Sequence, residues 1–224
     1  MRLLGLAFFI IPFLISSVAY PRDVKVGNST MSVSPTTGFC ELDETKKADS
    51  SWLASVTNLL KASGVYAIAA FPDCRELQKA RKTGEFITSK VYITAPFSQI
   101  DKLKPEGVPE TCDDLRTREY SDKDKAELAK SIKEFANGNS AAESKALGVL
   151  DETKGVVCYV ATLQKVKTKA GDLSTMLGLF AVTSARNSML FLYQFTPYVD
   201  ATSIPTALAN LKIVYTEFAR ANSQ

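Results

Sequence analysis

The last third of the chain contains three segments whose composition is typical of β-strands, and this feature constrains the fold most. Residues 156–166, 174–184 and 188–197 are rich in β-branched and aromatic side chains. They are separated by the short connections 167–173 and 185–187. Connections this short join antiparallel neighbours, whereas parallel strands need a long crossover. The sequence therefore predicts an antiparallel three-strand meander.

Three helices are predicted around this meander. Apolar residues recur every three or four positions in residues 49–63 and again in residues 203–221, which indicates one amphipathic helix in each segment. A further helix from Asp73 to Lys82 begins with the pair Asp73 and Glu76, which has the spacing of a capping box.

The middle of the chain predicts two more strands. Residues 65–71 are uniformly apolar and too short for a helix, which favours a buried strand. In residues 86–95 apolar and polar side chains alternate, which indicates a half-exposed strand. We expect short helices at 111–118, from Ser121 to Gly138, and after the pair Ser140 and Glu143. Together these elements predict a single α+β domain in which helices cover an antiparallel sheet.

The N-terminus has the pattern of a secretory signal peptide. Arg2 is followed by an apolar run in residues 3–15 and then by small residues up to Ala19, where we expect cleavage. An uncleaved membrane anchor is the alternative, but spanning a bilayer takes about 20 apolar residues, and Pro12 interrupts this run. No later segment approaches that length, so we expect no transmembrane segment after cleavage.

The chain is thus predicted to have three parts. Residues 1–19 form the signal peptide, residues 20–38 form an extended N-terminal leader with a short strand at 24–26, and residues 39–224 form the α+β domain. The predicted location is outside the cytosol, either periplasmic or secreted.

Cysteine usage agrees with export. Cys40, Cys74, Cys112 and Cys158 are even in number and widely spaced, and none belongs to a C-x-x-C pair. In an oxidising compartment this pattern predicts two structural disulfides. Three connectivities are open. We predict Cys74 with Cys112 and Cys40 with Cys158, because this choice nests a short loop inside a long one.

The charge balance and the missing residue types exclude several functions. The 27 lysines and arginines nearly balance the 24 acidic residues, which argues against nucleic acid as a partner, because such proteins need a concentrated basic face. The chain has no histidine, so Ser-His-Asp and Cys-His nucleophile pairs and histidine-ligated metal sites are excluded. Phosphate-binding glycine loops and the nucleophile-elbow motif are also missing from the sequence. We expect no catalytic residues, no metal and no cofactor.

Several clusters of charged residues can be explained either by the stability of helices and strands or by a binding function. The acids Glu110, Asp113, Asp114, Asp122 and Asp124 resemble a hard-cation site, but acids early in helices are expected from the helix dipole. The lysines and arginine at Lys79, Arg81 and Lys82 suit a helix C-terminus. The hairpin lysines Lys165, Lys167 and Lys169 are typical of strand edges, where they discourage aggregation.

Aromatic residues and one glycosylation motif complete the candidates. Phe191, Tyr193, Phe195 and Tyr198 place one alternating face in the core, and Tyr193 with Tyr198 could line a pocket. Trp52 is expected to be a core residue of the first helix. Asn28-Ser29-Thr30 is an N-glycosylation sequon, relevant in a eukaryotic source.

Three segments carry a resemblance to known proteins. Residues 38–43, residues 72–77 and the pair Cys158-Tyr159 resemble a loose group of exported bacterial proteins of unknown function, from about Gly38 to Ala221. The motifs are structural cysteines and strand residues, so the resemblance implies no activity. The order of three strands followed by a helix also resembles PsbP-type proteins, which implies a binding or assembly module.

The favoured hypothesis is an exported, non-enzymatic binding or structural module whose partner is a protein, a small-molecule ligand or an envelope component. One alternative is a hydrolase that uses two carboxylates and no histidine, as glycosidases do. Such an enzyme predicts two acids facing each other in a cleft, one with a strongly raised pKa. A secreted effector acting outside the cell is a third hypothesis.

Overall fold

The computed structural model of the chain describes residues 21–85, 87–102, 107–116, 144–167 and 173–223. The strands of these residues are β1 (Arg22–Val26), β2 (Ser29–Val33), β3 (Val65–Pro72), β4 (Lys90–Pro96), β5 (Ser144–Thr153), β6 (Val157–Lys167), β7 (Leu173–Ala185) and β8 (Ser188–Pro197). The helices are α1 (Lys47–Ala62), α2 (Cys74–Thr83), α3 (Gly107–Arg116) and α5 (Ser203–Asn222), with a short 3₁₀ turn at Phe97–Gln99.

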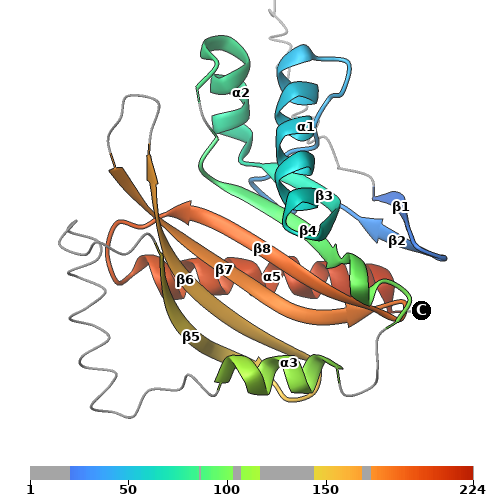
Figure 1. Cartoon of the computed structure of the whole chain (residues 1–224). Helices are drawn as coiled ribbons and strands as arrows, with labels where there is room; N and C mark the ends of the chain where they lie inside the picture. Colours follow the sequence, from blue (N-terminus) through green and yellow to red (C-terminus); the bar gives the residue numbers. More distant parts are fainter. Residues whose placement is uncertain (1–20, 86, 103–106, 117–143, 168–172, 224) are drawn as a thin grey trace, which may run out of the picture.

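Six of these strands form one antiparallel sheet in the order β3-β4-β8-β7-β6-β5, and β1 pairs with β2 in a separate hairpin. The predicted α+β class, the antiparallel sheet and the C-terminal meander β6-β7-β8 are therefore confirmed (Figure 1). The β7–β8 connection is a two-residue turn in which Arg186 and Asn187 both have positive φ, as the twist of a tight hairpin requires.

The sheet separates two layers (Figure 1). Helix α5 and the β1–β2 hairpin cover one face, where Leu211 and Phe218 pack in the same core as Leu190 and Leu192. Helices α1 and α3 lie on the opposite face, with α1 over the β3–β4 side and α3 over β5 and β6. We call these the α5 face and the open face.

The strand predicted at residues 24–26 lies within β1, and the sequence did not predict its partner β2. The two strands form the β1–β2 hairpin, whose side chains Val26, Met31 and Val33 are almost completely buried in the main core. The backbone amide of Ser32 donates to Asn222 of α5, and the Asn222 side chain donates back to the Ser32 carbonyl. Contact with the end of α5, far away in the sequence, is what orders this segment.

Two predictions for the middle of the chain are wrong. The helix expected after Glu143 is replaced by strand β5, which is held by its pairing with β6. The strand expected to be half exposed, now β4, is covered on both faces, since Tyr92 and Thr94 are as buried as Val91 and Ile93. The helix predicted from Ser121 to Gly138 lies outside the described residues.

Helix α2 begins as predicted, but the capping box is only half formed. The Asp73 carboxylate accepts from the amides of Arg75 and Glu76 at 2.9 and 3.0 Å, as an N-cap should. Glu76 turns away from the helix start and accepts hydrogen bonds from Thr88 and Ser89 instead. It therefore fixes the segment that leads into β4.

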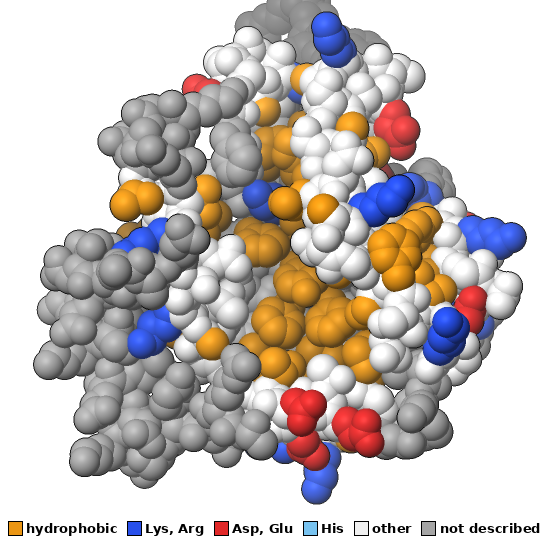
Figure 2. Space-filling view, in the orientation of Figure 1, with side chains coloured by type: hydrophobic (Ala, Val, Ile, Leu, Met, Phe, Trp, Pro, Cys, Tyr) orange, Lys and Arg blue, Asp and Glu red, His pale blue; other side chains and the backbone are white. Residues whose placement is uncertain are grey.

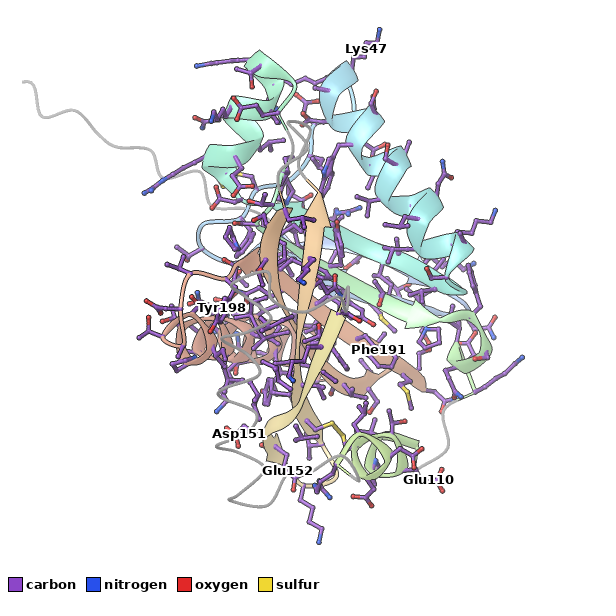
Figure 3. The ribbon with its side chains drawn as sticks, turned by 60° about the vertical axis from the view of Figure 1, so that its left-hand side comes forward. Lys47, Glu110, Asp151, Glu152, Phe191 and Tyr198 are labelled. Carbon is purple, nitrogen blue, oxygen red and sulfur yellow. A yellow bond between two sulfur atoms is a disulfide. The ribbon has the colours of Figure 1, made fainter. Side chains whose placement is uncertain are left out.

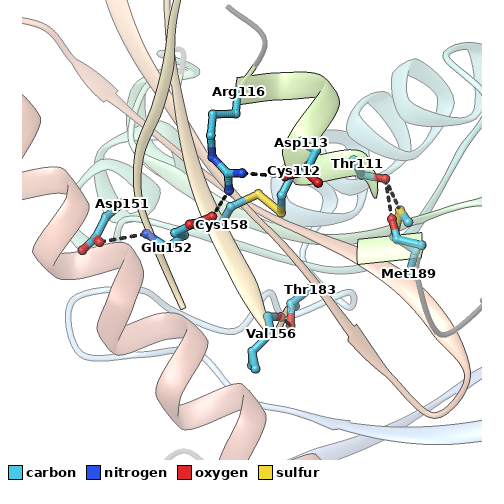
Figure 4. Close-up of a disulfide and its surroundings, with 11 residues drawn as sticks. Thr111, Cys112, Asp113, Arg116, Asp151, Glu152, Val156, Cys158, Thr183 and Met189 are labelled. Carbon is cyan, nitrogen blue, oxygen red and sulfur yellow. Dashed lines mark hydrogen bonds and ion pairs between the residues drawn. A yellow bond between two sulfur atoms is a disulfide. The ribbon is translucent and has the colours of Figure 1, made fainter. Parts of the chain in front are cut away.

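All four cysteines form disulfides, but the predicted pairing is wrong. The bonds are Cys40–Cys74 and Cys112–Cys158. An isolated β-bridge beside the first pair, in which the Cys40 amide donates to the Pro72 carbonyl, brings its Cα atoms to 5.1 Å. Packing of α3 over β6 brings the second pair to 6.0 Å (Figure 4). Tertiary contacts, which loop length does not reveal, determine both pairs.

A buried ion pair joins α1 to α2. The carboxylate of Asp49 is completely buried and accepts two hydrogen bonds from the guanidinium of Arg81, one of them 2.9 Å long. Hydrogen bonding to Arg81 holds the pKa of Asp49 below its usual range. The amide of Asp43 donates to the same carboxylate, so the charge is compensated on several sides.

We expect Arg81→Met to lower the free energy of unfolding by about 3 kcal/mol, because it leaves a buried carboxylate without its counter-charge. Chemical denaturation measures this loss. Arg75→Met, at an exposed position of the same helix, is the matched control and should change stability by less than about 0.5 kcal/mol. Equal effects of the two substitutions would contradict a structural role for the ion pair.

Candidate functional site

The open face of the sheet presents a continuous set of aromatic side chains. Phe191, Tyr193 and Phe195 alternate along β8 and share this face, since successive strand residues point to opposite sides. Their cross-strand neighbours supply Phe180 from β7 and Tyr92 from β4. Each of the three β8 rings is only half buried, whereas the intervening Leu192 is completely buried under α5.

The rings follow one another at stacking distances. Centroids of Phe180 and Tyr193 are 5.4 Å apart, those of Phe191 and Tyr193 are 6.0 Å apart, and those of Tyr193 and Phe195 are 6.1 Å apart. Tyr92 continues the series at 5.8 Å from Phe195. Offset and tilted ring pairs at these distances are favourable, so the rings support one another as a defined surface.

A glycine makes room for one of these rings. Gly178 of β7 lies opposite Phe195, and a Cβ atom there would come within 3.1 Å of the ring edge and of the Thr162 hydroxyl. The ring can therefore lie flat over the backbone of β7. This local approach keeps Phe195 on the open face beside Tyr193.

Two helices form the walls on either side of the aromatic surface. On the α1 side, Trp52 and Val56 pack with Tyr92, and the ring centroids of Trp52 and Tyr92 are 6.3 Å apart. On the α3 side, Val108 and Cys112 pack with the β6–β7 end of the sheet. Figure 2 shows hydrophobic side chains gathered in the hollow between these walls. We call this surface the aromatic groove: Trp52, Tyr92, Phe180, Phe191, Tyr193 and Phe195.

Helix α3 is held in place by three kinds of contact (Figure 4). The Cys112–Cys158 disulfide ties it to β6. Arg116 forms ion pairs with Asp113 on the same helix and with Glu152 of β5. The Thr111 hydroxyl lies 3.8 Å from the sulfur of Met189 at the start of β8. The α3 wall is therefore covalently fixed to the sheet.

The two sides of the groove differ in charge. Lys90 on β4 lies with its Nζ 5.7 Å from the centroid of the Phe195 ring and donates to the Ile87 carbonyl. The α3 wall carries exposed acids at Glu110, Asp113 and Asp114. Figure 2 shows acidic side chains at the lower edge of the hollow. One end of the groove is therefore basic and the other is acidic.

Burial shifts the pKa of several groups in this surface. It lowers the pKa of Lys90 to about 8, while the nearby Glu76 carboxylate acts in the opposite direction. Burial also raises the pKa of Tyr92 and Tyr193. Both tyrosines are consequently neutral at physiological pH, and their hydroxyls are hydrogen-bonding groups within an apolar surface.

Within the described residues, the carboxyl group with a raised pKa does not face a second acid, as a two-acid hydrolase would need. Among the described carboxyl groups with a shifted pKa, only that of Glu41 is raised, by burial. Its neighbour is the cation Arg22, at 3.5 Å, and not a second acid. Within the described residues, no cluster of three or more acids or cysteines is placed to hold a metal ion.

The charged candidates from the sequence are dispersed in the structure. Asp113 pairs with Arg116, and the acids predicted at Asp122 and Asp124 lie outside the described residues. In the basic cluster of α2, Lys79 pairs with Glu85 while Arg81 turns inward to Asp49 and Lys82 is exposed. Within the described residues, neither the acidic cluster nor the basic cluster of α2 brings its side chains together around one binding site.

The second basic cluster and the sequon are only partly described. Lys165 lies on β6 and pairs with Thr175 of β7. The pairing of β6 with β5 ends at the preceding residue, Gln164. The Lys167 side chain and all of Lys169 lie outside the described residues. Asn28 is exposed in the β1–β2 turn, where its backbone N–H donates to the Asp101 carboxylate at 2.8 Å.

The aromatic prediction was correct about alternation and wrong about which face is in the core. The buried face of β8 carries Leu190 and Leu192, and the aromatic face is the accessible one. Tyr198 does not join Tyr193, since it follows β8 and packs against the main core near α5 (Figure 3). Trp52 is half buried at the end of the ring series. Phe180 and Tyr92 were missed, because strand register, and not local sequence, brings them to the β8 rings.

Three cavities are lined by residues other than the β8 rings, and one of them reaches the groove at Trp52. One of about 300 Å³ lies at the start of α5, one of about 360 Å³ lies at its end, and one of about 250 Å³ lies between α1 and α2. The helices of the described residues are also all too short or too polar to cross a membrane.

Comparisons with known proteins assign no family. No family model matches the chain, and no curated protein matches it. Among solved structures, the Ran-binding protein Mog1p of Saccharomyces cerevisiae matches with a TM-score of 0.35 and 14% identity, over 91% of this chain and 95% of that one. A likeness this weak carries no argument about function. The resemblance to exported bacterial proteins stays a prediction.

The lowered pKa of Lys90 predicts a pH-dependent stability. An unfolded lysine keeps its proton up to about pH 10.4, so above about pH 8 the unfolded state binds more protons than the folded state. Lys90 therefore makes the folded state more stable as the pH rises from 8 to about 9.5. Tyr92 and Tyr193, with raised pKa values, stay neutral in the folded state. In the unfolded state they begin to ionise only toward the upper end of this range, which opposes the Lys90 effect slightly.

Chemical denaturation of the wild type, Lys90→Met and Lys90→Arg at several pH values checks this expectation. Lys90→Met should be more stable than the wild type at pH 7, with an advantage that shrinks by pH 9.5. Lys90→Arg keeps its charge over the whole range, so its stability should lack the increase with pH that Lys90 contributes. The same increase in stability with pH in all three proteins would show that Lys90 does not cause it.

Proposed function

We propose that the chain is an exported binding module whose aromatic groove holds an apolar segment of a partner protein. The observation that carries this proposal is the series of half-buried rings between α1 and α3. Aromatic residues are enriched in the cores of protein interfaces and often provide most of the binding energy. A surface of this kind gains free energy when a partner removes it from water.

The shape of the groove favours a protein over a small molecule. Small ligands are usually bound in concave sites that bury most of their surface, and the β8 rings Phe191, Tyr193 and Phe195 line none of the three cavities of about 250 to 360 Å³. An open sheet face between two helices instead fits a segment with several apolar side chains. Rings fixed by their neighbours also lose little conformational freedom on binding.

The charged residues at the two ends of the groove indicate which charges the partner segment would carry. The α3 wall carries three carboxylates and the single guanidinium of Arg116, so lysines or arginines on the partner would be attracted to this side. The Lys90 end would attract a carboxylate of the partner. The proposed partner segment therefore has aromatic or aliphatic anchors, with a basic flank toward α3.

Export is supported by the apolar run in residues 3–15 and by the two disulfides. Disulfides persist in oxidising compartments and are rare in the cytosol. The two-acid hydrolase remains an alternative that no described pair of carboxyl groups favours.

Selection of a random peptide library on the mature chain tests the proposal without knowledge of the natural partner. We expect enriched peptides to combine apolar anchors with lysine or arginine on one side. Trp52 is the single tryptophan and lies at the end of the groove, so its fluorescence can report binding by peptides that lack tryptophan. Phe191→Ala should weaken binding about tenfold or more, as expected for the loss of a central aromatic anchor.

Val199→Ala is the matched control, because Val199 is 81% exposed on the opposite side of the sheet, beside the start of α5. It should bind the peptides like the wild type. Phe191→Leu keeps the apolar surface and serves where Phe191→Ala unfolds, as judged by circular dichroism. Peptides that bind Phe191→Ala and Phe191→Leu as tightly as the wild type would refute the proposed groove.

A further inference from the structure

A buried amide lies on the α5 face, on the side of the sheet opposite to the aromatic groove. Gln194 of β8 is only 3% exposed, and its Oε1 has no hydrogen-bond partner among the described residues. An acceptor withdrawn from water in this way costs free energy unless a donor reaches it. A buried polar atom without a partner therefore indicates a position where a further molecule makes the bond.

Gln194 is one of the residues that line the cavity of about 300 Å³ at the start of α5. This volume stands at the lower end of the range of small-molecule sites. The polar residues around it include Gln194, Thr196, Asp200, Ser203, Thr206 and Asn210, and Pro197 and Val199 are among its apolar residues. The lining contains hydroxyl, amide and carboxylate groups and no lysine or arginine.

The charges at this site balance each other. The first turn of α5 presents the positive end of the helix dipole. Asp200 precedes it and accepts hydrogen bonds from the amide and the hydroxyl of Thr202, which lower the pKa of Asp200. Asp200 is therefore ionised at neutral pH, and its charge offsets the helix end. A full negative charge on a ligand would be repelled by Asp200, and a full positive charge would be repelled by the helix end.

Hydrogen-bonding capacity gives the chemistry of the ligand. Oε1 of Gln194 and the Asp200 carboxylate accept hydrogen bonds, while the amide of Asn210 can both donate and accept. Ser203 is partly committed, because its hydroxyl oxygen accepts from the amides of Val199 and Asp200. A ligand that fits must donate at the base of the cavity and also accept at its wall. Hydroxyl groups do both.

We propose that this cavity binds a small, neutral, polyhydroxylated molecule of the size of a monosaccharide, with one hydroxyl donating to Oε1 of Gln194. Such a hydroxyl would supply the donor that this buried acceptor lacks among the described residues. The carbon skeleton of the ligand packs on Pro197 and Val199 at the apolar side of the cavity. This site is separate from the aromatic groove, since Gln194 and Tyr193 point to opposite faces of β8.

Titration of the ¹⁵N-labelled protein followed by amide chemical shifts tests this site. The probes are glucose, galactose, mannose, myo-inositol and glycerol, with ethanolamine and acetate as charged counterparts. We expect at least one neutral polyol to give saturable shifts at Thr196, Ser203 and Thr206. Saturation by none of the neutral probes, or tighter binding of ethanolamine or acetate, would overturn the proposal.

The variant Gln194→Leu separates a ligand contact from a structural role. Leucine keeps an apolar side chain of similar size and removes the unpartnered acceptor, so the midpoint of thermal unfolding should not fall. Binding of the polyol should weaken about tenfold, because its hydroxyl loses a buried partner. Binding equal to that of the wild type would contradict the assignment of Gln194.

Two controls make the result specific. Ser184→Ala alters the cavity at the other end of α5 and should leave polyol binding unchanged. Phe191→Ala alters the aromatic groove and should also leave it unchanged, so failure of the polyol site and failure of the protein-binding groove are distinguishable. Equal loss of polyol binding in Ser184→Ala would show that the effect is not local to the start of α5.

Discussion

The alternation of side chains along β8 is the constraint on which the rest of the structure depends. Leu190, Leu192 and Gln194 point to α5, and Phe191, Tyr193 and Phe195 point to the open face. A shift of one residue in the pairing with β7 would exchange these two sets. The tight turn at Arg186 and Asn187 fixes this register, and so one hairpin defines both the core and the accessible surface.

The disulfides fix the elements that pack on this sheet. The Cys112–Cys158 bond holds α3 against β6, and the Cys40–Cys74 bond joins the segment before α1 to the start of α2. The Asp49–Arg81 pair then connects α1 with α2. Since α1 and α3 are the walls of the aromatic groove, covalent and ionic contacts both determine its shape. These cysteines have a structural role as disulfides and not a catalytic one.

Local sequence patterns predicted the parts of the fold that depend on local energies. The meander, α1, α2 and α5 follow from periodicity and capping, and their bounds agree with the structure to within a few residues. Strand β5 was missed because the pair Ser140 and Glu143, which has the spacing of a capping box, indicated a helix after it. Pairing with β6 overrides that local pattern.

The candidate sites depended on contacts between distant residues, so the sequence revealed little of them. The pattern Phe191-Tyr193-Phe195 indicated a shared face, but only the pairing of β8 with β4 and β7 adds Tyr92 and Phe180 to it. Nothing local to Gln194 or Asp49 indicates that each is buried. The cysteine count gave the number of disulfides, while their pairing follows from the bridge at Phe39 and the position of α3.

The proposed binding role depends on an aromatic groove that is accessible in the full chain. Paramagnetic relaxation by a soluble gadolinium chelate, measured on the ring protons of assigned phenylalanines, tests it most directly. The account predicts strong relaxation of Phe180, Phe191 and Phe195, and weak relaxation of Phe71, which is 2% exposed in the main core. Equal protection of all four rings would contradict an open groove.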